Sequence, residues 1–155
     1  MPIARPIPGW LVFAAALLFA PNPLLAQSAE DALKAYNAGD YARALAIASP
    51  LADAGDTKAQ VILGTMYIAG RGVPKDPVKG CLLLRSAAEH GDAVAQYRLG
   101  AALSQGVGGT RDLAEAARWI EKSAEQGYPD AQFKMESWCV SAPPGREDGC
   151  IPRDE

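Results

Sequence analysis

The sequence predicts an all-α fold: an α-α superhelix, or solenoid, of stacked helical hairpins with about seven helices. Two observations support this prediction. The phrase GDTKAQVILG at 55–64 returns as GDAVAQYRLG at 91–100, 36 residues later, and a repeat of this length is typical of solenoids built from one supersecondary unit. Within each copy, apolar residues recur on one face of an α-helix, as Ala59, Leu63 and Met66 do in the first.

Residues 1–26 have the layout of a secretory signal peptide and are not expected to belong to the repeat domain. Arg5 precedes an apolar run at 10–20, and Ala26 supplies a small residue for cleavage. A bilayer-spanning helix needs roughly 20 apolar residues, so cleavage after Ala26 is favoured over retention as a membrane anchor. The protein is therefore expected to be periplasmic or secreted, with no stable membrane insertion after cleavage.

Glycines and aspartates mark the helix boundaries. Gly55, Gly91 and Gly127 each follow an alanine-rich run and are expected to be left-handed C-terminal caps. Aspartates precede the apolar periods and can cap the next helix: Asp40, Asp56, Asp76, Asp92 and Asp112. The predicted repeat domain at 27–140 contains a short hairpin at 29–54, longer hairpins at 57–90 and 93–126, and a capping helix at 129–140, followed by a tail at 141–155.

Other glycines predict special backbone or packing. The first and third loop glycines of the long hairpins recur after 36 residues, which predicts positive φ at both places: Gly70, Gly72, Gly106 and Gly108. Gly64 and Gly100 lie inside helices and indicate close approach of the neighbouring helix. Glu136 replaces this glycine in the third copy, where no ordinary repeat is expected to follow. Pro50 is expected to kink its helix or to split off the last turn.

The segment GDTKAQVILGTMYIAGRGVPKD, followed by AAEHGDAVAQYRLG, closely resembles the Sel1-like repeat family, a relative of the tetratricopeptide repeat with a longer loop inside each hairpin. The two long hairpins match this pattern and the hairpin at 29–54 is tetratricopeptide-like. The resemblance implies a scaffold for protein–protein interaction, often in bacterial envelope assembly, signalling or host contact. Gly80 departs from the pattern, because the family usually has alanine there.

Composition and motifs give no support for nucleic-acid binding or catalysis. After residue 26 the chain holds 14 basic and 18 acidic residues, a formal charge of −4, which is no electrostatic footprint for nucleic acid. The one histidine, His90, lies at a helix end, and no set of metal ligands or cofactor motif is present. We therefore expect a protein that is not an enzyme and has no cofactor.

The alternative function is a cell-wall or β-lactam-interacting enzyme, because some cysteine-rich exported relatives have been linked to that activity. No serine is followed three residues later by lysine, as the serine β-lactamase motif requires. The chain also lacks the cysteine pair that those relatives carry in each repeat. These two departures make the scaffold the favoured interpretation.

The three cysteines allow one disulfide bridge in an exported protein. Cys139 and Cys150 are the favoured pair, because the stretch VSAPPGREDG between them can fold back. The tail would then cover the end of the solenoid. Cys81 is left over: it is interpreted as a half-buried small residue, with a reactive thiol that links two chains as the alternative.

A protein or peptide partner is expected against the concave face of helices 57–69, 93–104 and 129–140. The candidate contacts are aromatic and basic residues of the second and third copies: Tyr97, Arg98, Phe133 and Lys134. Val61, Tyr97 and Phe133 share one repeat position, and packing between repeats is the favoured role for this stripe, with partner contact as the alternative. The glutamines beside it at 60, 96 and 132 are expected to hydrogen-bond neighbouring backbone. Self-association could enlarge so small a surface.

Overall fold

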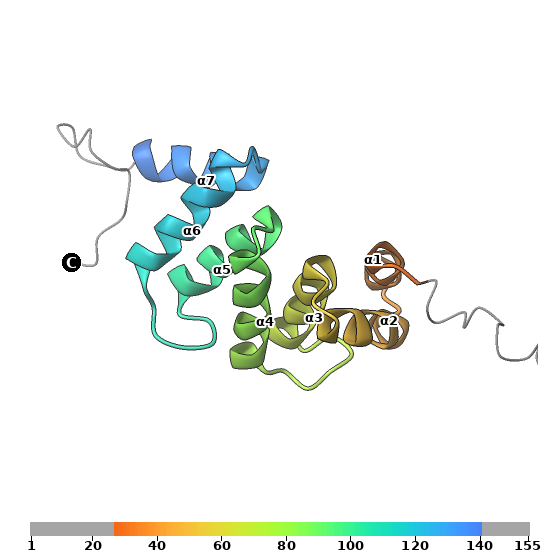
Figure 1. Ribbon diagram of the computed structural model, residues 1–155. Coiled ribbons are helices and arrows are strands. Elements are labelled where there is room, and N and C mark those ends of the chain that lie inside the picture. The colour runs from red at the N-terminus through yellow and green to blue at the C-terminus, as the bar shows by residue number, and fades with distance from the viewer. Residues whose placement is uncertain (1–26, 141–155) are drawn as a thin grey trace, which may run out of the picture.

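The computed structural model describes residues 27–140, which form seven α-helices and no β-strand within that range (Figure 1). The predicted signal peptide at 1–26 and tail at 141–155 lie outside the described residues. The helices are α1 (Ala29–Asn37), α2 (Tyr41–Asp53), α3 (Thr57–Ala69), α4 (Pro77–Glu89), α5 (Ala93–Gln105), α6 (Leu113–Glu125) and α7 (Pro129–Val140). The predicted all-α solenoid fold with about seven helices is confirmed over this range.

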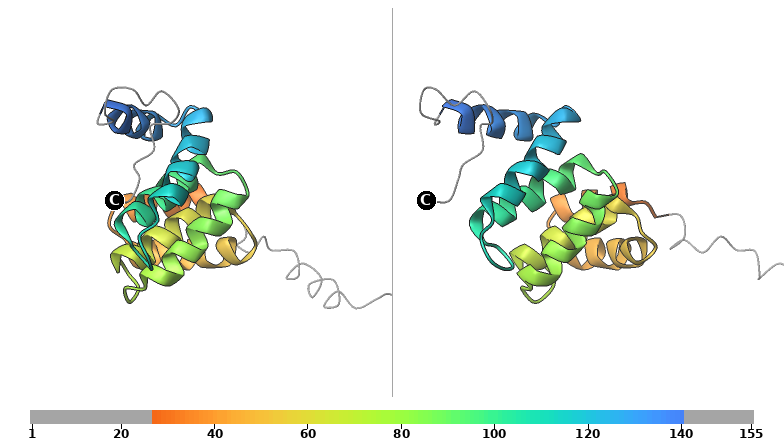
Figure 2. Two further views of the ribbon diagram at one scale, coloured as in Figure 1. Left: turned by 90° about the vertical axis from the view of Figure 1, so that its left-hand side faces the viewer. Right: turned by 60° about the vertical axis from the view of Figure 1, so that its left-hand side comes forward.

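The helices stack in chain order into a short solenoid. Each helix packs mainly on its neighbours in the chain, and further contacts join α1 to α3 and α3 to α5. The stack runs from the α1–α2 hairpin at one end to α7 at the other (Figures 1 and 2). Because α1, α3 and α5 are the first helices of successive hairpins, their mutual contacts create one continuous face.

Every predicted aspartate cap is present. The carboxylates of Asp40, Asp56, Asp76, Asp92 and Asp112 each accept a hydrogen bond from the backbone N–H three residues later, at 2.8–3.1 Å. Gly55, Gly91 and Gly127 have φ values of 90°, 90° and 83°, and the four loop glycines also have positive φ. The capping aspartates and the glycines with positive φ therefore mark where these helices start and end.

The interior glycines lie where two helices of a hairpin cross closely. A Cβ atom on Gly64 would lie 2.9 Å from the carbonyl oxygen of Gly80, and one on Gly100 would lie 2.6 Å from Cγ1 of Ile120. The predicted close approach is confirmed. It also explains why Gly80 departs from the alanine pattern, since its own Cβ would lie 2.6 Å from the Gly64 oxygen.

Pro50 does not split α2, so that part of the prediction is wrong. The helix continues from Tyr41 to Asp53 with Pro50 inside it. The proline lies in the last turn and is exposed, so it removes one hydrogen bond near the helix end and forces no buried rearrangement. Its own carbonyl still accepts the N–H of Ala54 at 3.1 Å.

Two clusters of buried residues in the described region join successive hairpins. The first contains the buried alanines of α1 and α2 together with Ile62, Leu63 and Met66 of α3. The second joins Val61 of α3 to Leu84, Ala87 and Ala88 of α4 and to Ala95 and Leu99 of α5. Small residues dominate both clusters, which allows the helices to approach closely.

The repeated glutamines tie neighbouring helices together as predicted. The amides of Gln60, Gln96 and Gln132 donate to the backbone oxygens of Ala52, Ala88 and Ala124, at 3.3, 3.1 and 3.4 Å. Each acceptor lies in the last turn of the preceding helix. The glutamines are therefore part of the hairpin-to-hairpin junction and not of a recognition surface.

Candidate partner-binding groove

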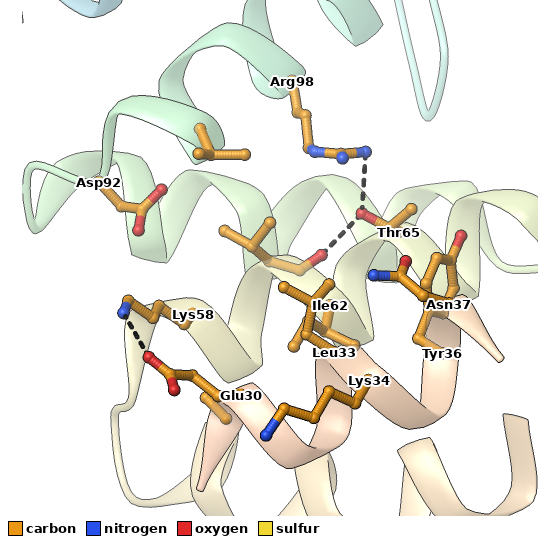
Figure 3. A pocket seen from close by; sticks show the side chains of 13 residues that line it. Glu30, Leu33, Lys34, Tyr36, Asn37, Lys58, Ile62, Thr65, Asp92 and Arg98 are labelled. Atoms are coloured by element: carbon orange, nitrogen blue, oxygen red, sulfur yellow. Dashed lines mark hydrogen bonds and ion pairs between the residues drawn. The ribbon is translucent and has the colours of Figure 1, made fainter. Parts of the chain in front are cut away.

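A groove of about 550 Å³ lies on the continuous face formed by α1, α3 and α5 (Figure 3). The groove forms because α3 contacts both α1 and α5, so that the exposed sides of the three helices lie on one surface. The side chains that line it are Ala29, Glu30, Leu33, Lys34, Tyr36, Asn37, Lys58, Val61, Ile62, Thr65, Asp92, Val94 and Arg98. We call it the α1/α3/α5 groove.

The floor of the groove is apolar and open to solvent. Leu33 of α1 is 46% exposed, although it is a large hydrophobic residue. Ile62 lies beside it on α3 (Figure 3), and Val94 of α5 is half-buried. Exposed apolar surface bordered by polar residues is typical of binding sites in soluble proteins.

Charged side chains border this floor. Lys58 and Glu30 form an ion pair at 3.9 Å, and Lys34 pairs with Asp31 at 3.6 Å outside the groove. Asp92 accepts the N–H of Ala95 at 2.8 Å as the cap of α5. Both acids that line the groove therefore already have partners.

Arg98 differs from the other charges of the groove. Its guanidinium makes one long hydrogen bond, 3.4 Å from Nη1 to the hydroxyl of Thr65, and it forms no ion pair with any residue between 27 and 140. Arg98 also affects the pKa of Tyr128: burial raises the pKa of that phenol, and the positive charge of Arg98 lowers it. Arg98 is thus an exposed cation with donors left for a partner.

The four predicted contact residues do not form one site. Arg98 lines the groove and also borders a second hollow of about 290 Å³ together with Tyr97, whose ring packs on that of Tyr128 with centroids 5.4 Å apart. Phe133 is 73% exposed on α7, and Lys134 lies over the ring of Trp138 at 5.2 Å. Neither residue of α7 lines the groove, and their role in binding stays a prediction.

The binding face predicted from the sequence comprised α3, α5 and α7, whereas the groove is lined by α1, α3 and α5. Leu33 was the available signal. In the segment AEDALKAYN the buried residues are Ala29, Ala32 and Ala35, so a leucine at 33 lies off the buried face of the helix. A single exposed leucine is a weak signal by itself, and it gains weight here because Leu33 lines the groove together with Ile62 and Val94.

The other candidate side chains have structural environments. The thiol of Cys81 is half-buried and donates to the backbone oxygen of Val107 at 3.1 Å, and burial raises its pKa. This favours the unreactive interpretation of Cys81. The predicted bridge between Cys139 and Cys150 lies outside the described side chains. His90 is exposed, with Nδ1 2.7 Å from the oxygen of Ser86 at the end of α4.

The described region contains neither a metal-ligand cluster nor a membrane-spanning helix. No three histidine, cysteine or carboxylate side chains between 27 and 138 are grouped so that they could hold a metal ion. None of the seven helices has the length and apolar content needed to cross a bilayer.

Comparisons with known proteins agree with the fold and with the repeat register. The family model of the Sel1 repeat matches residues 57–92 and 93–128. A Sel1 repeat protein from Oxalobacter formigenes is similar in structure, with a TM-score of 0.68 and 31% identity over 72% of this chain. The antigen c5321 is described as protective, present in uropathogenic Escherichia coli strains and displaying an SLR fold; it has a TM-score of 0.65 and 29% identity over 82% of this chain.

This chain covers 45% of the first of these structures and 28% of the second, so it spans less than half the length of either. No curated protein matches it. The 36-residue register of caps, glycines and glutamines coincides with the two matched repeats. The chain is therefore a Sel1-like repeat protein, an all-α solenoid of a fold that serves as a scaffold for protein interaction.

Proposed function

We propose that this protein is an exported scaffold without catalytic activity, which binds a segment of another protein in the cell envelope. The binding site is the α1/α3/α5 groove, and its role is in periplasmic signalling, envelope assembly or host contact. The observation that carries this proposal is the open apolar floor around Leu33 and Ile62, on the face to which three hairpins contribute.

Two properties of the groove support docking of a protein segment. Its shape is set by the backbone stack, because capped helices and close glycine crossings hold α1, α3 and α5 in place. A preformed site loses little conformational entropy on binding. Its open form, lined by thirteen residues of three hairpins, suits an extended or helical segment better than a small enclosed substrate.

The proposed location depends on residues 1–26, whose pattern is that of a signal peptide. Fractionation of cells that express the full chain tests it. The processed protein is expected in the periplasmic or extracellular fraction, with a new N-terminus at Gln27. An unprocessed protein in the cytoplasm would contradict the envelope assignment.

Site-specific photocrosslinking in the native envelope tests the groove. A photoreactive residue at position 33 is expected to capture a discrete protein partner. The same residue at position 43, on the exposed side of α2, is the matched control and should capture little. Equal capture from both positions, or none from position 33, would exclude the groove as the docking site.

A further inference from the structure

We infer that the α1/α3/α5 groove selects a protein segment with an aliphatic side chain and a nearby aspartate or glutamate. The aliphatic group would pack on Leu33 and Ile62, and the carboxylate would pair with Arg98. This inference depends on the proposed docking function and adds the chemistry of the partner.

The first argument is the unequal use of the charges in the groove. Its lining holds three cations, Lys34, Lys58 and Arg98, and two acids, Glu30 and Asp92. Glu30 is paired with Lys58, and Asp92 is the cap of α5. An incoming acidic group therefore meets an available guanidinium, whereas an incoming basic group would have to compete for carboxylates that are already engaged.

The second argument is the chemistry of Arg98 itself. A guanidinium carries five N–H donors in a planar fork and favours two-point contact with a carboxylate. The 3.4 Å bond to Thr65 uses only one of these donors. The hydroxyl of Thr65 in turn donates to the oxygen of Val61 at 2.7 Å, so the oxygen that receives Arg98 is held in place.

The third argument is the arrangement of the two features. Figure 3 shows Leu33 and Ile62 between Arg98 on one side and the Lys58–Glu30 pair and Lys34 on the other. One short segment can therefore place an aliphatic group on the floor and a carboxylate at Arg98 together. The chain after residue 26 has a formal charge of −4, so overall charge would not attract an acidic partner and the preference must be local.

Selection from a displayed library of random dodecapeptides on the purified protein tests this inference. The matched variants are Arg98→Glu, which reverses the charge in the groove, and Leu33→Glu, which places a charge on its floor. Arg43→Glu on α2 reverses an exposed charge outside the groove and is the control. All three positions are exposed, and thermal unfolding verifies that each variant folds.

The expected peptides share an aliphatic residue at a fixed spacing from an aspartate or glutamate. They should lose about 10-fold or more in affinity for the Arg98→Glu and Leu33→Glu proteins, which corresponds to about 1.4 kcal/mol. The reason is that Arg98→Glu replaces attraction by like-charge repulsion and Leu33→Glu places a charge against the bound aliphatic group. They should keep their affinity for Arg43→Glu. Selection on the Arg98→Glu protein should enrich lysine or arginine in place of the acid.

Two outcomes would contradict the inference in distinguishable ways. Peptides that lose affinity for Leu33→Glu, but show no acidic enrichment and no response to Arg98→Glu, would leave docking intact and overturn the acidic chemistry. Peptides that bind all variants equally, or a selection that yields no binder sensitive to Leu33→Glu, would overturn the groove and the proposed function together.

Discussion

Replacing His90 with glutamine is expected to stabilise the protein, because it would complete a hydrogen bond that one repeat makes and the other lacks. In the second repeat, Nε2 of Gln126 donates to Oε1 of Gln96 at 2.7 Å. In the first repeat the corresponding acceptor is Oε1 of Gln60, which is buried and has no hydrogen-bond partner among the described residues. One repeat before Gln126 lies His90, whose ring contacts the Ser86 oxygen instead.

The magnitude follows from the environment of Gln60. Its side chain is buried, with 8% of the residue exposed, and a buried acceptor without a partner costs about 1–3 kcal/mol. The new glutamine starts from an exposed position, so ordering its side chain offsets part of the gain. We expect the free energy of unfolding to rise by about 1 kcal/mol, which corresponds to an increase of roughly 4 °C in Tm for a domain of this size.

Urea and thermal unfolding at pH 8 provide the measurement. His90→Asn is the matched control, because its amide is one methylene too short to repeat the Gln126 contact. The reverse change, Gln126→His, should lower the free energy of unfolding by a similar amount, because it leaves Gln96 without its donor.

This reasoning would be refuted if the free energy of unfolding of His90→Gln were within about 0.3 kcal/mol of the values for both the original protein and His90→Asn. A difference of about 0.3 kcal/mol is the usual scatter among independent substitutions. It would mean that the two repeats are equivalent in sequence register but not in side-chain geometry. A gain of equal size in His90→Asn would point to backbone or helix-end effects instead of the hydrogen bond.

Four other substitutions test the packing and one ion pair. Gly100→Ala should lower the free energy of unfolding by about 1–3 kcal/mol despite the better helix propensity of alanine, because its Cβ would lie 2.6 Å from the neighbouring helix; no loss in urea unfolding would contradict the close crossing. Val61→Ala should cost about 1 kcal/mol or more, whereas Phe133→Ala, at a position 73% exposed, should stay within about 0.5 kcal/mol. The hydrogen bond from Arg85 lowers the pKa of Glu115, so the stability that Glu115→Gln removes should be full above about pH 5 and disappear as the pH falls through that lowered pKa. A pH-independent difference between the two urea midpoints would exclude the ion pair as its source.

The sequence predicted the parts of the fold that depend on neighbours a few residues apart. Aspartate caps need only the N–H three residues later, and the loop glycines need only their own φ. The glutamine contacts span eight residues and repeat with the same period. Because all these interactions lie within one hairpin or its junction, one copy of the repeat specifies them and the second copy confirms the interpretation.

The groove was less predictable, because it depends on how successive hairpins are placed side by side. The contribution of α1 arises from its packing against α3 across the α2 helix, and no local pattern states that geometry. The stripe of Val61 and Phe133 shows the same limit: one repeat position is 8% exposed inside the stack and 73% exposed on α7. Its environment is set by whether another hairpin follows.

Ile62, Arg98 and Lys134 occupy the same repeat position in α3, α5 and α7. This position shows how a regular repeat can still provide a specific binding residue. Ile62 packs in the core cluster with the alanines of α1, Arg98 is exposed over the groove, and Lys134 covers the ring of Trp138. The backbone repeats at this position but its surroundings change from one hairpin to the next, so a single residue type cannot suit all three. Recognition of a partner is therefore expected at repeat positions where the residue type differs between hairpins. The positions where the same residue type recurs maintain the helix packing of the scaffold.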